Sequence, residues 1–235
     1  MGMLLPEKST IEQELAAVYR LYSALAREQD PEFGLGGKLL FAGELAPDAC
    51  RLIRAANIAG AASLAASADA AVQRQAIREG VVDFLVTSLD EALRILKNEI
   101  RKRQPVAVCV AEAPEKVMCQ MAERGVQPGL LAACVTEAAE GAVFLARGAR
   151  RVEAAPQLEG RKFLVLEIPA AWAQRIAAFD ALIAESAAAA GHANRRWLRL
   201  SPRYLGAAAR RFRSLECDEV TAARLIDLTG KQISE

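Results

Sequence analysis

Short apolar runs alternate with segments of helical character through the middle of the chain, from Gly37 to Val135. Strands that alternate with helices over short connections form right-handed βαβ units and a doubly wound sheet. The sequence therefore predicts an α/β fold: a Rossmann-like, mostly parallel sheet in a three-layer sandwich. The predicted strands are residues 38–42, 61–67, 81–86, 106–110 and 130–135.

Proline, glycine and capping residues mark the helices between these strands. Pro47 falls in a first turn, where the missing amide costs nothing. Ser88 and Glu91 have the spacing of a capping box, in which each side chain binds the other residue's free backbone amide. The predicted helices are residues 47–58, 70–78, 88–103 and 114–124.

The first 36 residues are predicted to form a helical arm. Its helix runs from Ser9 to Arg27, and Ser9 with Glu12 forms another predicted capping box. Apolar residues recur every three or four positions and make a narrow seam, which either packs against its own domain or forms a dimer contact. The members of the seam are Ile11, Leu15, Val18, Tyr22 and Leu25.

Residues 136–235 are predicted to form a third part, an α/β extension packed on the core of residues 37–135. Residues 161–168 form a predicted strand that can extend the edge of the sheet, and residues 136–146 and 170–190 form predicted helices. The last region is also predicted to be helical. Its arginines and interleaved aromatic residues either bind phosphates or pair with acids. The arginines are Arg195, Arg196, Arg199, Arg203, Arg210, Arg211 and Arg213.

Composition narrows the functional classes. Hydrophobic residues make up 53% of the chain and charged residues 25%, which permits a sizeable core and argues against disorder. The net charge of +1 argues against nucleic-acid binding and favours arginines that pair with acids. The five cysteines form no CxxC pair, so we expect buried, reduced thiols. With neither a signal-peptide pattern nor a membrane-spanning apolar run, we expect a soluble cytoplasmic protein without membrane contact.

Several positions in the core occur in step with a known family. Residues 88–93 read SLDEAL, Pro105 precedes the fourth strand, and Val117 is followed by RGV at residues 124–126. These positions resemble S-I-E-E-A-L, the proline, E-V and R-G-V of the NAD-binding domain of urocanase (urocanate hydratase). The similarity runs without a gap from Asp69 to about Val135, and residues 37–67 follow the same strand–helix–strand order. The resemblance implies a Rossmann-like domain that, in urocanases, binds NAD.

The loops that hold the cofactor in that family differ here. Urocanases have a glycine-rich loop of the type AGLGGMGGAQ after the first strand, where residues 42–48 of this chain read AGELAPD. The family's E-V-D after the second strand is Ser-Ala-Asp at residues 67–69, and its G-N after the fourth is Glu-Ala at residues 112–113. The polar D-Q-T-S-A-H-D after the fifth has become ACVTEAA at residues 133–139. All four loops follow the carboxyl ends of strands, where such sheets bind ligands.

These differences in the loops disfavour the binding of NAD. A carboxylate about 4 Å from one phosphate charge costs roughly 1 kcal/mol in water and roughly 4 kcal/mol at an effective dielectric constant near 20. We therefore expect no cofactor, with NAD at this loop as the less favoured alternative. The chain also has no room for the urocanase catalytic core, and its one histidine, His192, lies outside the similar segment, where we expect a loop or helix-cap residue.

The candidate site residues are Gly43, Glu44, Asp69 and Glu112, with Asp48 beside them. The carboxylates either cap helices and face solvent or form a site for a cation or a small basic ligand. We assign no catalytic residue, and no zinc, Walker or nucleophile-elbow motif is present. The first hypothesis is a non-catalytic binding or assembly module, expected to be a homodimer and open to a protein partner. The alternative is an enzyme, related to urocanase-type lyases, that binds a nucleotide, small ligand or metal at this edge.

Overall fold

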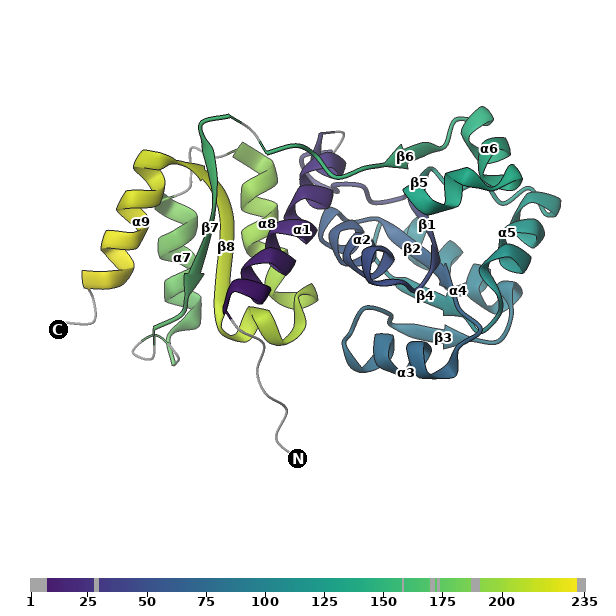
Figure 1. The fold of residues 1–235 in the computed structure, drawn as a ribbon, viewed down its shortest axis with the longest axis horizontal. Coiled ribbons are helices and arrows are strands. Elements are labelled where there is room, and N and C mark those ends of the chain that lie inside the picture. The colour runs from purple at the N-terminus through teal and green to yellow at the C-terminus, as the bar shows by residue number, and fades with distance from the viewer. Residues whose placement is uncertain are drawn as a thin grey trace. The chain divides into compact units, whose positions relative to one another are not determined.

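The computed structural model describes residues 8–27, 30–157, 159–169, 172, 174–186 and 191–231 (Figure 1). Its contacts divide the chain into two compact units: residues 18–155 form the first, and residues 1–17 with 156–235 form the second. These divisions differ from the boundaries expected after residues 36 and 135. The second half of helix α1 (Lys8–Ala26) and strand β6 (Arg150–Val152) belong to the first unit.

The first unit, the parallel-sheet unit, contains a sheet of order β3-β4-β2-β1-β5-β6 in which every pair is parallel. This arrangement confirms the predicted Rossmann-like α/β fold. Strand β6, with the sequence RRV, was not predicted, because an edge strand with exposed residues needs no continuous apolar run. The other strands are β1 (Leu39–Glu44), β2 (Ala62–Ala66), β3 (Phe84–Val86), β4 (Ala107–Val110) and β5 (Leu130–Ala132).

The helices of this unit begin and end close to the predicted residues. Gly60 ends α2 with φ 101°, a left-handed conformation that glycine adopts without strain. One half of the capping box before α4 is confirmed, since the Glu91 amide donates to Ser88 Oγ at 3.3 Å. The Glu91 carboxylate instead accepts bonds from the amide and hydroxyl of Thr87. The helices are α2 (Pro47–Ala59), α3 (Ala70–Arg78), α4 (Leu89–Arg101), α5 (Pro114–Glu123) and α6 (Ala139–Ala146).

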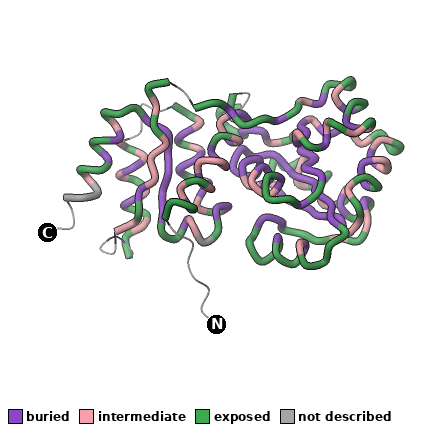
Figure 2. Tube along the Cα trace, viewed as in Figure 1, coloured by how far each residue is buried: buried purple, intermediate pink, exposed green. Residues whose placement is uncertain are grey.

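The core of the parallel-sheet unit lies along β1, β2 and β4, which are buried almost throughout (Figure 2). Two predicted strands were too long. Residues 81–83 form a bend before β3, which is a short edge strand with Phe84 47% exposed. Residues 133–135 leave the sheet and open a 3-10 helix, η1 (Ala133–Glu137).

Helix α1 carries the predicted seam, and all five of its residues are buried within the single chain. This burial agrees with the interpretation that the helix packs on its own chain. Ser9 lies inside the helix rather than at its cap, and the residues before Lys8 lie outside the described part of the chain. No helix in the described ranges is both long and apolar enough to cross a membrane.

The second unit contains a separate two-stranded antiparallel sheet of β7 (Arg161–Glu167) and β8 (Phe212–Asp218). Strand β7 was predicted, but it does not extend the parallel sheet. Strand β8 lies in the arginine-rich region predicted to be helical, where both faces of the strand are buried and no polar alternation marks it. The other elements are α7 (Ile176–Ser186), α8 (Gly191–Tyr204), a 3-10 helix η4 (Gly206–Arg210) and α9 (Glu219–Lys231).

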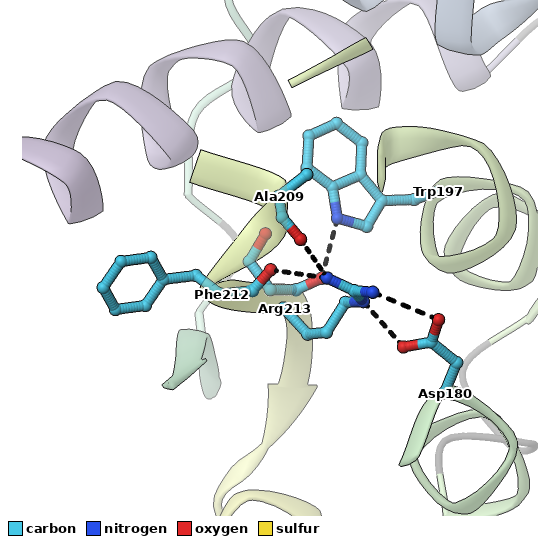
Figure 3. Close-up of polar contacts among 6 residues, drawn as sticks. Asp180, Trp197, Ala209, Phe212 and Arg213 are labelled. Carbon is cyan, nitrogen blue, oxygen red and sulfur yellow. Dashed lines mark hydrogen bonds and ion pairs between the residues drawn. The ribbon is translucent and has the colours of Figure 1, made fainter. Parts of the chain in front are cut away.

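Helix α7 is shorter than the predicted helix of residues 170–190, of which residues 170, 171, 173 and 187–190 lie outside the described part. Trp172 precedes α7 in a turn, and its ring packs 5.6 Å from that of Phe179. Polar side chains then fix α7 and α8 to β8 (Figure 3). The Arg213 guanidinium pairs with Asp180 of α7, and Trp197 Nε1 of α8 donates to the Ser214 carbonyl at 2.7 Å.

Candidate functional site

The carboxyl ends of β4, β2, β1 and β5 follow one another along the edge of the parallel sheet. Gly43 and Glu44 are the last two residues of β1, and the other candidate residues lie in the segments that follow β1, β2 and β4. In doubly wound sheets, ligands bind outside this edge where the strand order reverses. In this sheet β2, β3 and β4 lie on one side of β1, and the later strands β5 and β6 lie on its other side. The strand order therefore reverses between β1 and β5. The crevice expected for a ligand is therefore bounded by the loop after β1 and by η1.

In the turn after β1, the backbone amides donate hydrogen bonds to a residue of the chain itself. The Leu45 amide donates to the Glu44 carboxylate at 3.1 Å, and the Ala46 amide donates to the Glu44 carbonyl at 2.8 Å. The next residue, Pro47, has no amide hydrogen. The three consecutive residues 45–47, of which Pro47 is the first of α2, therefore offer no N–H to a ligand. The exposed carboxylate of Glu44 adds negative charge at the same place.

Gly43 is buried and has φ 72° at a β-bulge in the pairing of β1 with β2. A Cβ at this position would lie 2.9 Å from Cγ2 of Val135 and 3.9 Å from Sγ of Cys134. Both neighbours belong to η1, which comes from the far side of the strand reversal. The absence of a side chain at Gly43 thus makes room for the side chain of Val135 in this crevice.

Helix α6 holds η1 in that position. A Cβ on Gly141 would lie 2.1 Å from the carbonyl oxygen of Val135, so only glycine lets the helix come this close. Val135 is buried, 6% exposed, between the two glycines. The sequence analysis did not predict that Val135 packs between Gly43 and Gly141. The signal available was Gly141 itself, because a glycine inside an apolar helix often marks close packing.

The remaining acidic candidates are engaged by nearby groups of the chain. Asp69 caps α3, accepting from the amides of Ala71 at 2.7 Å and Val72 at 3.3 Å. Asp48 is exposed and pairs with Arg51 at 2.7 Å.

Glu112 pairs with Lys116 at 2.5 Å and accepts from Gln120 at 3.3 Å. Within the described residues, no group of three His, Cys, Asp or Glu side chains is arranged to hold a metal ion. These contacts support the interpretation of the carboxylates as helix caps and surface ion pairs.

The five cysteines are all free, but they differ in exposure. Cys109 on β4 is buried, and burial, with a smaller contribution from the charge of Glu44, raises the pKa of its thiol to about 12. Cys217 on β8 is also buried, which raises its pKa. Cys134 in η1 is exposed, so the expectation that all the thiols are buried was wrong for this residue.

Alkylation of the native protein at about pH 8 should therefore modify Cys134 before Cys109 and Cys217, because the thiolate is the reacting form and needs access. Peptide mass spectrometry after timed iodoacetamide treatment measures the order. The Cys134→Ser variant should lose the fastest site. Modification of Cys109 at a rate near that of Cys134 would show that this edge of the sheet opens in solution.

A cavity of about 470 Å³ lies at the opposite, amino edge of the sheet. It is bounded by one face of α4 and by the segments before β1 and β5, and sequence reasoning did not find it. Lys97 and Arg124 are among its lining residues, near the carboxyl ends of α4 and α5, where cations offset the helix dipoles. Arg124 also pairs with Asp90.

The histidine and the arginine-rich region form no catalytic arrangement among the described residues. His192 lies in the first turn of α8, and its Nδ1 is 3.1 Å from Nη2 of Arg195. Arg211 pairs with Glu167, and Arg213 pairs with Asp180, as expected for arginines that balance acids.

A family model of the urocanase Rossmann-like domain matches residues 21–142. The match covers just over half of the 235 residues and includes strands β1 to β5, which confirms the resemblance found in the sequence. Strands β6, β7 and β8 and helices α7, α8 and α9 lie outside the matched residues.

Proposed function

Because this chain belongs to the urocanase Rossmann-like domain family, we propose that it is a non-catalytic binding or assembly module that keeps the family's sheet without its dinucleotide site. The observation that carries the proposal is the turn after β1. Helix N-termini bind phosphates through free backbone amides. Here Leu45 and Ala46 donate their amides to Glu44, and Pro47 has none.

The closed crevice supports the same proposal. Val135 and Cys134 reach across to Gly43, and Gly141 holds their segment in place. A diphosphate at this point would have to displace packed side chains as well as overcome the charge of Glu44. Each amide contact that is lost removes roughly 1 kcal/mol, and the charge adds roughly 1 to 4 kcal/mol according to exposure. Together these terms lower the affinity for a dinucleotide by several powers of ten.

Isothermal titration with NAD⁺ tests the proposal directly. We expect no saturable heat and no rise in melting temperature, because a ligand that binds only the folded state must stabilise it. Glu44→Gln removes the charge but leaves the crevice filled, so it should gain little affinity. Asp48→Asn is the matched control, since Asp48 is exposed and pairs with Arg51. Tight NAD⁺ binding or turnover of urocanate by the unmodified chain would contradict the proposal.

A further inference from the structure

The cavity at the amino edge of the parallel sheet has the size of a ligand site. Its volume is about 470 Å³, and small-molecule sites in proteins have volumes of roughly 300 to 1,000 Å³. The lining comes from the segment that enters β1, from one face of α4 and from the turn between α5 and β5. All three segments belong to the parallel-sheet unit, so the cavity lies within one compact body.

The side chains of the lining are largely apolar. Leu39 of β1 and Leu96 of α4 are buried, at 8% and 1% exposed. Leu93, Ile100 and Val126 line the same cavity and are half-buried. Half-buried apolar side chains around a cavity favour a ligand that covers them, because their remaining surface then leaves water. The cavity therefore suits a molecule with an apolar body.

The charged side chains of the lining are all cations. Lys38, Lys97 and Arg124 are exposed, and none of the described residues that line the cavity is acidic. Arg124 pairs with Asp90, so its charge is already offset. In the described part of the chain, no carboxylate forms an ion pair with Lys38 or Lys97. Two lysine charges thus remain for an anion.

The carboxyl ends of α4 and α5 lie near the cavity, and a helix dipole places about half a negative charge at such an end. This partial charge resides on the carbonyls of the last turn. The amides of residues 102–104 donate to carbonyls in the last turn of α4, and those of residues 124–126 do the same for α5. The full charges of the two lysines therefore outweigh the helix ends, and the cavity favours a negative group.

We propose that this cavity binds a small organic anion with an apolar body, of which a straight-chain monocarboxylate is the simplest example. The apolar chain covers Leu93, Leu96 and Ile100 of α4, and the carboxylate pairs with Lys38 and Lys97. A few polar groups that orient an otherwise apolar ligand are the usual composition of such sites. The site goes beyond the proposed function, which concerns the crevice at the opposite edge of the sheet, and the two can fail separately.

Amide NMR of the full chain, titrated with hexanoate, octanoate and decanoate, tests the site directly. We expect saturable shift changes for one ligand per chain, concentrated in residues 37–39, 93–100 and 124–129. The affinity should rise roughly threefold to fourfold for each added methylene that is buried. Octan-1-ol and octylammonium have the same chain as octanoate with no charge or the opposite charge. Octan-1-ol should bind at least roughly tenfold more weakly than octanoate, and octylammonium should not bind.

A double variant, Lys38→Met with Lys97→Met, removes both charges and keeps the apolar stems of the side chains. Its affinity for octanoate should fall roughly tenfold, and its affinity for octan-1-ol should stay the same. Lys102→Met is the matched control, because Lys102 follows the same helix, pairs with Glu99 and does not line the cavity. It should bind octanoate as the wild type does. Circular dichroism checks the folding of both variants, and the three eight-carbon probes on the wild type decide the question if the double variant does not fold.

No saturable binding of any of the three carboxylates at millimolar concentrations overturns the proposal. Equal affinity for octanoate and octylammonium, shift changes centred outside the cavity, or equal losses in Lys102→Met and a folded double variant overturn it as well. Shift changes confined to the lining, with a preference for the carboxylate that the double variant loses, support it.

Discussion

Replacing Gly141 by alanine should lower the free energy of unfolding by about 3 kcal/mol, the upper end of the range for overpacked sites. The new Cβ would lie 2.1 Å from the carbonyl oxygen of Val135 and 3.0 Å from the Thr136 Cα, and neither is the end of a flexible side chain that could turn away. Helix α6 must therefore move off η1, or η1 must leave the crevice beside Gly43. Either movement loosens the closure at the strand reversal.

Urea unfolding followed by circular dichroism measures this change, because both tryptophans lie outside the parallel-sheet unit. Gly129→Ala is the matched control. Gly129 lies in the same unit, and a Cβ there would be 3.6 Å from Lys38 Cδ, an ordinary contact. That variant should differ from the wild type by less than about 1 kcal/mol. Equal effects of the two substitutions would show that η1 is not held tightly against α6.

Removing the Asp180 carboxylate by an alanine substitution should cost about 2 kcal/mol, because it leaves the Arg213 guanidinium buried without its counter-charge. Arg213 is 6% exposed, and its Nε lies 2.6 Å from Asp180 (Figure 3). The carbonyls of Ala209 and Phe212 still accept from it but carry no full charge. The expected cost stays below the 3 to 5 kcal/mol of a fully buried pair because the Asp180 side chain is 35% exposed.

Tryptophan fluorescence reports this transition, since Trp172 and Trp197 both belong to the second unit. Glu167→Ala is the matched control: its pair with Arg211 has a similar length of 2.9 Å, but both side chains are more than 40% exposed. An exposed pair of this kind contributes less than about 1 kcal/mol. The double variant Asp180→Leu with Arg213→Met should recover part of the loss. If Asp180→Ala cost no more than Glu167→Ala, the pair would not anchor α7 to β8.

Most of the parallel-sheet unit was predictable because its signals are local. The β1, β2 and β4 runs are buried almost throughout, so their sequences are mostly apolar, and Pro47 and Gly60 mark the two ends of α2. The edge strands β3 and β6 were predicted less well or not at all. An edge strand is held by backbone bonds to one neighbour and leaves little trace in its side chains.

The positions of the candidate site residues in the chain were predictable because they too depend on local sequence. The sequence predicted that Gly43, Glu44, Asp69 and Glu112 follow the ends of strands. The structure places Asp69 and Glu112 there and makes Gly43 and Glu44 the last two residues of β1. What each carboxylate binds depends on geometry: Asp69 turns back to the amides of α3, and Glu112 turns to Lys116. Spacing in the sequence cannot distinguish a helix cap from a ligand when both need the same side chain.

By itself the sequence determined the α/β class, the family and the loss of the glycine-rich loop, because these follow from periodicity and from residue types at neighbouring positions. The tertiary structure alone decided that Val135 fills the crevice beside Gly43 and that β7 pairs with β8 in a second sheet. Both contacts join segments far apart in the chain, about 90 residues for the first and 50 for the second. They depend on how packed elements meet, and no local preference of either segment encodes that.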